Sequence, residues 1–314
     1  MKSLKIVALA GGVGGAKLVY GLAKVINPKN LSVIVNTGDD FEHYGLYICP
    51  DLDTVCYNLA GLSNPKTGWG RRGDTFHALQ QAILLGGLDW FKLGDLDLGT
   101  HLERTRRIRA GETLSTITAD FCRSWGIATT ILPMTDQIVS TYLMTDQNEW
   151  LSFQDYFVRR QCKPVIRKIE TRGSETAKPA KGIQNIIQDA DFVIICPSNP
   201  WLSIDPILAI KPIKEWLHKK TVIAVSPIIH GATVRGPAAK ISKELGINPS
   251  ASSVAEHYKG LIRAFVIDTQ DELEKEAISL YDIIPLVTNI LMTDDSAKAR
   301  LASEIVDFYL TNFA

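Results

Sequence analysis

The sequence predicts an α/β protein with a Rossmann-like, mostly parallel sheet and helices on both of its faces. Short apolar runs rich in β-branched residues recur along the chain, at residues 5–10, 31–36, 191–200, 221–229 and 264–269. Helical patterns lie between the later runs, at residues 203–218, 236–245 and 252–259. Continuous apolar strands that alternate with helices are typical of a parallel sheet covered on both faces.

The first predicted unit is a strand, a turn and a helix, followed by a second strand. Residues 5–10 form the first strand, residues 11–15 form a glycine-rich loop, and residues 31–36 form the second strand after a helical stretch. Such a unit places two parallel strands side by side through a right-handed crossover. At the other end of the chain, a strand-like segment around 282–292 precedes a helical pattern at 296–310.

The middle of the chain has a different pattern. From about residue 134 to 170, turn signals such as Asp146-Gln147-Asn148 separate alternating segments, which is typical of an antiparallel ribbon. A polar loop follows at residues 172–182. We therefore predict a single Rossmann-like domain over residues 1–314, with a small antiparallel lobe inserted at about 134–182.

Composition excludes several classes of protein. The chain has 314 residues, and its 34 Lys and Arg balance its 34 Asp and Glu, which argues against a nucleic-acid binder that depends on bulk charge. No apolar run is long enough to span a bilayer. The five cysteines include no C-x-x-C pair, a pattern that favours reduced thiols and a cytoplasmic location.

The glycine loop is the first candidate binding site. Gly11, Gly12, Gly14 and Gly15 stand between the first strand and the first helix. Glycines there let the backbone approach a phosphate, and the helix N-terminus offers free N–H groups. The spacing is not that of a Walker loop and matches the dinucleotide fingerprint only loosely. The alternative is a tight turn packed on the sheet.

Four carboxylates make up the second candidate site. Asp39 and Asp40 follow the second strand, and Asp51 and Asp53 open a helical stretch a few residues later. Asp51 or Asp53 could simply cap that helix. Ligands bind at the carboxyl edge of open α/β sheets, and hard oxygen ligands suit Mg²⁺ bridged to substrate phosphates. The pattern therefore predicts an Mg²⁺ site.

A basic segment follows at Lys92. Lys92 is a candidate partner for a carboxylate or an anionic substrate, and we expect His101 to hydrogen-bond locally rather than to act as a base. Four arginines lie on or near a helix predicted to begin at Thr100, namely Arg104, Arg106, Arg107 and Arg109. Such runs usually form a solvated helix face, with a ligand role as the alternative.

Two further loops follow strands at the same predicted edge. Ser198 and Asn199 come after the run at 191–196, and Ser226 comes after the run at 221–225. Ser, Asn and Pro all favour ordinary turns. Because several such loops meet at one edge of a parallel sheet, we expect these side chains to contribute to binding.

The blocks that carry these residues resemble the 2-phospho-L-lactate transferase family of coenzyme F-420 biosynthesis. They occur in the family's order from residue 10 to about 260: GGVGGAKL, VNTGDD, ICPDLDTVCYNLAG, GWGRRGDTF, KLGDLDLGTHLERTRRIRAG, LPMTDQ, FQDYFV, PSNPWLSI and SPIIHGATVRGPAAK. The PDLDT, KLGD and PSNP blocks are more specific than the glycine loop. His230 departs from the family, whose members often carry glycine there.

The resemblance implies an activity and a set of substrates. Members transfer a phospholactyl, phosphoenolpyruvyl or related group from a guanosine-diphosphate-linked donor to the deazaflavin Fo, releasing GMP with Mg²⁺ as the required metal. The resemblance also implies a Rossmann-like fold with a small extra lobe, usually as a homodimer. It places the residues matching Asp53 and Lys92 at the deazaflavin, and Asp39, Asp51 and Asp53 near the metal and diphosphate.

Together these patterns assign roles to the predicted residues. Asp53 or Asp51 would orient the acceptor hydroxyl or take its proton, as general acid–base chemistry requires. The amides of Gly11, Gly12, Gly14 and Gly15 would bind the diphosphate, and Ser198, Asn199 and Ser226 would assist. The sequence leaves open which three-carbon acid the donor carries.

Two other functions are compatible with parts of the sequence. A related branch of the superfamily acts as a non-catalytic regulator that binds nucleotide-sugars, and the PDLDT, KLGD and PSNP blocks favour the transferase over it. An NAD-dependent oxidoreductase would need an acidic residue at the end of the second strand, where Asn36 stands and Asp39 is only close.

Overall fold

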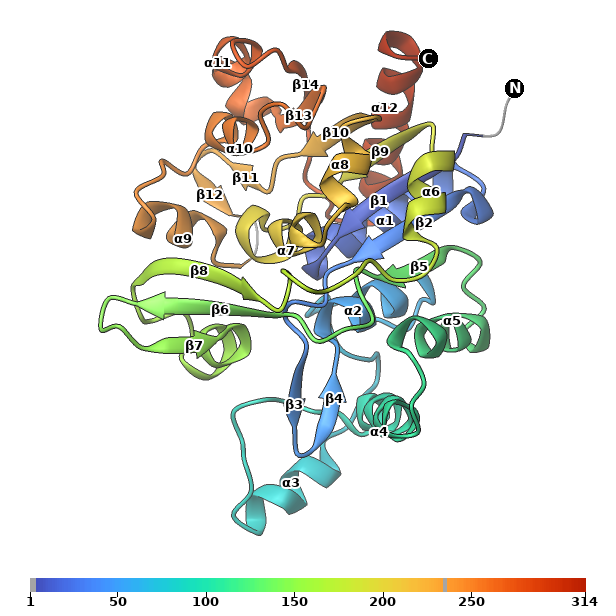
Figure 1. The fold of residues 1–314 in the computed structure, drawn as a ribbon, viewed down its shortest axis with the longest axis vertical. Coiled ribbons are helices and arrows are strands. Elements are labelled where there is room, and N and C mark those ends of the chain that lie inside the picture. The colour runs from blue at the N-terminus through green and yellow to red at the C-terminus, as the bar shows by residue number, and fades with distance from the viewer. Residues whose placement is uncertain (1–3, 234–235) are drawn as a thin grey trace.

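The computed structural model describes residues 4–233 and 236–314. Its centre is a seven-stranded sheet in the order β14-β13-β10-β9-β1-β2-β5, and every neighbouring pair is parallel (Figure 1). The strands are β1 (Ile6–Ala10), β2 (Leu31–Val35), β5 (Thr130–Pro133), β9 (Phe192–Ile195), β10 (Thr221–Val225), β13 (Ala264–Asp268) and β14 (Ile284–Thr288). The first strand thus lies at the interior of the sheet, between β9 and β2.

Side chains along each central strand alternate between two apolar layers. In β1, Ile6, Ala8 and Ala10 belong to one buried cluster, whereas Val7 and Leu9 belong to the other. This alternation is the period of two that a pleated strand imposes. A strand buried on both faces must be apolar at every position, which is why these runs are continuous rather than alternating.

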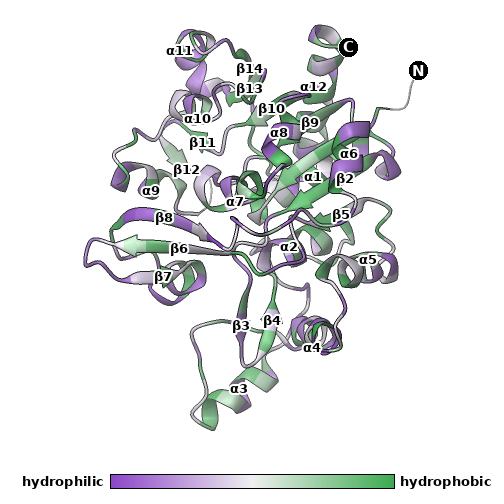
Figure 2. Cartoon of the chain, in the orientation of Figure 1, coloured by the Kyte–Doolittle hydropathy of each residue, from purple (hydrophilic) through white to green (hydrophobic). Residues whose placement is uncertain are grey.

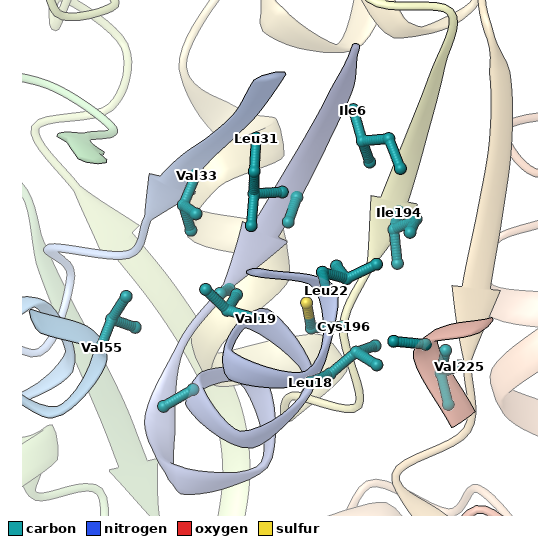
Figure 3. Close-up of a cluster of buried hydrophobic side chains, with 14 of the residues drawn as sticks. Ile6, Leu18, Val19, Leu22, Leu31, Val33, Val55, Ile194, Cys196 and Val225 are labelled. Carbon is teal, nitrogen blue, oxygen red and sulfur yellow. The ribbon is translucent and has the colours of Figure 1, made fainter. Parts of the chain in front are cut away.

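Helices cover both faces of the sheet. On one face α1, α2, α5 and α12 contribute to the cluster drawn in Figure 3, and on the other α6, α7, α8, α10 and α11 do so. The helices are α1 (Gly12–Val25), α2 (Pro50–Leu59), α3 (His77–Leu84), α4 (Asp95–Arg109), α5 (Leu114–Ser124), α6 (Ile183–Asp189), α7 (Asp205–Ala209), α8 (Ile213–Leu217), α9 (Ala238–Glu244), α10 (Ala251–His257), α11 (Lys275–Ser279) and α12 (Asp295–Asn312).

Three small antiparallel sheets extend from this core. The expected lobe is a three-stranded sheet in the order β7-β6-β8, and its apolar side packs against α9 and the helical turn at Pro200–Ile204. A hairpin of β3 and β4 follows the loop after β2 and extends away from the central sheet toward α3 (Figure 1). The small strands are β3 (Phe41–His43), β4 (Leu46–Ile48), β6 (Ser140–Thr145), β7 (Trp150–Ser152), β8 (Ile166–Arg172), β11 (Ile228–Ile229) and β12 (Ala232–Thr233).

The structure confirms the predicted α/β class, the parallel sheet and the antiparallel lobe. It corrects one boundary, because the helix expected from Thr100 begins at Asp95. The β3–β4 hairpin and α3 were not predicted, and the helical region at 203–218 is broken into short pieces. Within the described residues, no helix is long and apolar enough to cross a bilayer.

Candidate active site

The glycine loop is held between two other loops of the sheet edge. The N–H of Gly11 donates to the hydroxyl of Ser198 at 3.0 Å, and that hydroxyl donates back to the Gly11 carbonyl at 2.8 Å. The N–H of Gly12 donates to Oδ1 of Asp51 at 2.7 Å. Loops after β1 and β9 and the start of α2 therefore meet at one place, as the sequence predicts for this edge.

Three of the loop glycines, Gly11, Gly14 and Gly15, are required by close packing. A Cβ on Gly14 would lie 2.4 Å from the carbonyl oxygen of Pro197, and one on Gly15 would lie 2.7 Å from the Ser198 hydroxyl. Gly14 and Gly15 therefore fit the expected alternative, a tight turn packed against the sheet. The same loop also leads into α1, whose first turn has no acidic residue and no side-chain cap on Gly11. The amides of Gly11 and Gly12 already have partners, so an anion at this helix end would be attracted by the α1 dipole and by amides further along the first turn.

Asp51 lies at the centre of a buried carboxylate group. Its Oδ2 accepts a hydrogen bond of 3.0 Å from the side-chain amide of Asn36, the residue that ends the β2 run. Burial raises the pKa of Asp51 to about 6, while the bonds from Asn36 and Gly12 act to lower it. A carboxyl with this pKa changes protonation near neutral pH, as a general base does.

Asp39 and Asp40 are buried beside it with oxygens that lack partners. Burial raises the pKa of Asp39 well above its usual range, and the charges of Asp51 and Asp40 raise it further. Burial likewise raises the pKa of Asp40. Among the described residues, Oδ1 of Asp39 and both oxygens of Asp40 have no partner within hydrogen-bond distance, although the nearby Cys49 thiol and Arg104 charge act to lower the pKa of Asp40. Buried carboxyls without partners are costly, so a positive group bound here would stabilise them.

Asp53 faces a different partner. Both of its oxygens accept bonds from the guanidinium of Arg104, at 3.0 Å for Oδ2 and through a second contact to Oδ1. The Asp53 and Arg104 side chains are 8% and 3% exposed, so the pair is sheltered from water. Nδ1 of His101 lies 3.2 Å from Arg104 and 3.7 Å from Asp53. Each oxygen of Asp53 therefore already has a partner.

The remaining polar residues of the edge play mainly local roles. Oδ1 of Asn199 caps the turn that follows it, bonding the amides of Trp201 and Leu202 at 3.1 and 3.2 Å. Its Nδ2 is buried and has no partner within the described part of the chain. The Ser226 hydroxyl bonds the backbone of Ile228 in its own loop.

Lys92 forms no hydrogen bond or ion pair with the buried carboxylates in the described part of the chain. Lys92 is exposed, next to Trp90 and Phe91, whose rings pack on Phe41 and His43 of the hairpin. In the described part of the chain, no carboxylate lies within ion-pair distance of it. His230 is also set apart: it adopts a positive φ of 47°, and its N–H bonds Asp271.

Sequence reasoning missed two residues that organise the site. The sequence places Asn36 at the start of the Asp39–Asp40 loop without giving it a role, and it favours a solvated helix face for Arg104 over a ligand role. The i, i+3 spacing of His101 and Arg104 places both on one face of α4. That spacing was the one sequence signal that could have identified Arg104 as a site residue. Asn36 accepts a local hydrogen bond from the Gly38 amide, but its own amide group donates to Asp51 and Leu202 in other loops, which leaves no local pattern.

The described residues contain no three-residue metal cluster. Over residues 4–233 and 236–314, no group of three or more His, Cys, Asp or Glu is arranged to hold a metal ion. The predicted ligands are instead divided, with Asp51 bonded to Gly12 and Asp53 bonded to Arg104. Only Asp39 of the three retains an oxygen without a partner.

Fold and site together define an α/β protein with a glycine loop beside buried carboxylates at the carboxyl edge of a parallel sheet. The family model described as "2-phospho-L-lactate transferase CofD" matches residues 6–306, and the chain belongs to this family. It is therefore a transferase of the 2-phospho-L-lactate type.

Relatives within the family carry two names. The "Phosphoenolpyruvate transferase" of Streptomyces coelicolor is 39% identical over 96% of this chain and 97% of that protein. The "2-phospho-L-lactate transferase" of Methanosarcina acetivorans is 37% identical over 98% of this chain and 99% of that protein. The protein of that name from Methanocaldococcus jannaschii is 38% identical over 96% of this chain and 97% of its own length.

Solved structures support the fold. A crystal structure of a Bacillus halodurans protein superposes with a TM-score of 0.63 and covers 97% of this chain and 100% of that one. Its sequence identity is 15%, so the likeness concerns the fold alone.

Proposed function

We propose that the protein transfers a phospholactyl or phosphoenolpyruvyl-type group from a guanosine-diphosphate-linked donor to the deazaflavin Fo and releases GMP. The observation that carries this proposal is the joining of the glycine loop to Asp51 and Ser198 at the sheet edge. The positive end of the α1 dipole attracts a diphosphate, and an adjacent carboxyl of raised pKa suits an acceptor hydroxyl.

The proposed step is a displacement at phosphorus. The oxygen of an Fo hydroxyl forms a bond to the distal phosphorus of the donor, the bond from that phosphorus to GMP breaks, and the hydroxyl proton passes to a carboxylate. Asp51 is the better base, because its partners Gly12 and Asn36 are neutral and its pKa is raised to about 6, whereas Asp53 is paired with the charged guanidinium of Arg104. Asp53 and Arg104 would then shape the acceptor side of the site.

Mg²⁺ is the metal we propose for this reaction. The partnerless oxygens of Asp39 and Asp40 fit a hard cation, and Mg²⁺ commonly takes one or two carboxylates together with water and substrate phosphate. When bound, it would neutralise charge on the diphosphate. Asp39 would hold it. Asp51 and Asp53, the other expected ligands, would contribute only by giving up present bonds.

Melting temperatures test the metal site. Addition of Mg²⁺ should raise the melting temperature of the parent but not that of Asp39→Asn.

The donor can be tested directly. The protein is incubated with Fo, Mg²⁺ and the guanosine-diphosphate conjugate of phospholactate, phosphoenolpyruvate or phosphoglycerate in turn, and GMP and the modified deazaflavin are measured by mass spectrometry. We expect one GMP for each modified Fo with at least one donor. Binding of donors without any GMP would instead favour the non-catalytic regulator.

We also propose a homodimer, formed through α3. This helix lies at the tip of the molecule and none of its residues is buried (Figures 1 and 2). Leu84 and Leu85 are 77% and 89% exposed, and residues 76–88 contain no Asp, Glu, Lys or Arg. A helix of eight residues is too short to be stable alone, so it needs a packing partner. A second copy offers the same uncharged apolar surface, as a two-fold interface requires.

Sedimentation velocity tests the dimer. Leu84→Glu should give a monomer, whereas Leu273→Glu, at a position 97% exposed elsewhere on the surface, should remain a dimer. A parent protein that sediments as a monomer would contradict the proposal.

We also propose a cytoplasmic location. The five cysteines are free thiols and four of them are buried, which favours a reducing compartment.

A further inference from the structure

A cavity of about 320 Å³ lies between α4 and α5, away from the glycine loop. It opens to solvent and is lined by residues of both helices and by Arg71, which precedes α3. None of the residues predicted for donor, acceptor or metal binding lines it. Its volume falls at the lower end of the range for small-molecule sites.

Aromatic rings form the wall of this cavity. Phe121 in the last turn of α5 and Trp125, the residue that follows the helix, have ring centroids 5.5 Å apart, and Tyr57 packs edge-on against Trp125 at 5.4 Å. Tyr57 is fully buried behind them. Rings fixed in this way offer a rigid apolar surface for another flat ring.

The cavity also contains a positive charge, the guanidinium of Arg71. The guanidinium of Arg71 lies 5.0 Å from the ring centroid of Tyr57 and 5.8 Å from that of Trp125. In the described part of the chain, no carboxylate lies within ion-pair distance of Arg71. The one acidic residue in the lining, Glu103, is already bonded by Arg106 through two contacts of 2.8 Å. The net charge left facing the cavity is that of Arg71.

We propose that this cavity binds a planar aromatic molecule that carries one negative charge. The ring would stack against Trp125 and Phe121, and its anionic group would bond Arg71. The rings already hold the guanidinium in place, so little side-chain entropy is lost when the anion binds. Gly99 supplies the room, because a Cβ at this position would meet no atom within 4 Å.

The cavity adjoins the active site through a short polar chain. Its floor includes Thr100, whose hydroxyl lies 2.9 Å from that of Tyr57, and Tyr57 donates to Asp97 at 2.6 Å. Nε2 of His101 is 3.7 Å from Asp97, and His101 contacts Arg104. A molecule bound in the cavity would thus sit behind the side chains that hold Asp53, without touching the donor.

Calorimetric titration with 2-naphthoate tests the proposal, with 2-naphthamide as the uncharged control. We expect one saturable site per chain for 2-naphthoate. The amide and the Arg71→Gln variant should bind about tenfold more weakly or worse, the loss expected for one bond to a charged group. Gly99→Leu should abolish binding by filling the cavity. Arg123→Gln removes the same charge from an exposed position on α5 and should bind like the parent.

Three results would overturn the proposal. They are an absence of saturable binding by the parent, equal binding of the charged and neutral probes, and unchanged binding by both Arg71→Gln and Gly99→Leu. Melting temperatures of all variants confirm that each is folded. The titration contains neither donor nor Fo, so its failure would leave the proposed transferase activity intact, and failure of the transferase assay would leave this site intact.

Discussion

Gly14 shows how a single residue fixes the distance between two loops. The carbonyl of Pro197 occupies the place where a side chain would begin, so the glycine loop and the loop after β9 can approach only if residue 14 lacks a Cβ. The hydrogen bonds between Gly11 and Ser198 depend on that approach. Packing and binding geometry are therefore determined by the same residue.

Gly14→Ala should lower the free energy of unfolding by about 1–3 kcal/mol, because its Cβ would force backbone atoms apart. Gly99→Ala is the matched control, since it adds the same methyl group to a helix at a position with open space. It should raise the free energy of unfolding by roughly 0.5–1 kcal/mol through helix propensity. Urea denaturation measures both, and a Gly14→Ala variant as stable as the parent would contradict the packing argument.

The Asp53–Arg104 pair is the second test at this scale. Asp53→Asn and Arg104→Gln each leave a buried partner unpaired, which costs about 3–5 kcal/mol. The free energy of unfolding should fall clearly less in the double variant than the sum of the two single losses, because neither buried charge then remains unpaired. Urea denaturation of all four proteins gives the coupling energy. Additive losses would mean that the two side chains do not depend on each other.

At the scale of elements, the sequence predicted strands better than helix ends. The continuous apolar runs identify β1, β2, β9, β10 and β13, because only a strand buried on both faces has that pattern. The start of α4 was placed too late since its N-terminal caps are not local. Asp74 accepts the amides of Leu96 and Asp97, while Asp95 accepts those of His77 and Ala78. Reciprocal capping across some twenty residues leaves no signature in a local window.

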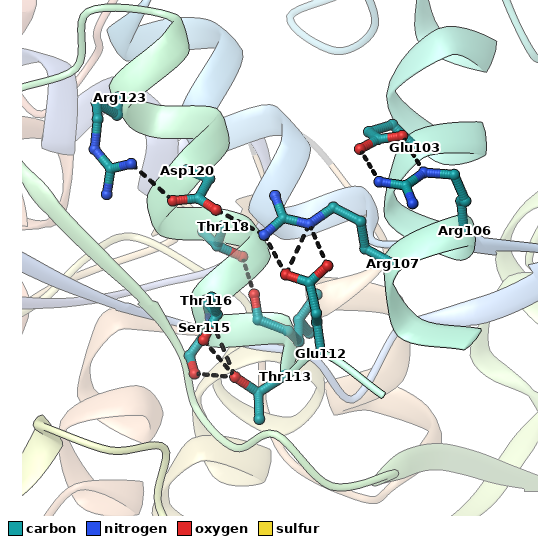
Figure 4. A network of polar contacts seen from close by, with 11 residues as sticks. Glu103, Arg106, Arg107, Glu112, Thr113, Ser115, Thr116, Thr118, Asp120 and Arg123 are labelled. Carbon is teal, nitrogen blue, oxygen red and sulfur yellow. Dashed lines mark hydrogen bonds and ion pairs between the residues drawn. The ribbon is translucent and has the colours of Figure 1, made fainter. Parts of the chain in front are cut away.

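The junction of α4 and α5 carries a network of ion pairs that makes stability depend on pH (Figure 4). Arg107 bonds Glu112 and Asp120, and these hydrogen bonds lower the pKa of both carboxyls. A lowered pKa in the folded state stabilises the fold above the ordinary carboxyl pKa. This stabilisation is lost as pH falls through the lowered value.

The difference in unfolding free energy between the parent and Arg107→Gln should therefore be largest above about pH 5 and should shrink below about pH 4. The network is partly exposed, so the difference should also decrease with added salt. Urea denaturation across this pH range provides the measurement. A difference that stays constant with pH would exclude these carboxyls as its source.

At the scale of the whole molecule, topology explains what the sequence could and could not predict about the site. Because parallel strands end at one edge, the loops that carry Gly11, Asp51 and Ser198 were expected to meet, and they do. Partners within the site depend on exact side-chain directions. Local sequence therefore did not show that Asp53 faces Arg104, nor that Lys92 stands exposed on the hairpin side.

The central claim is that Asp51, the carboxyl group beside the glycine loop, acts as the general base of the transfer. Single-turnover release of GMP by Asp51→Asn, measured with Fo, Mg²⁺ and the donor that the parent prefers, tests it most directly. We predict a rate lower by about 10²–10⁴-fold, the usual contribution of a general base, in a protein whose circular dichroism matches that of the parent. GMP release at a rate near that of the parent would contradict the claim.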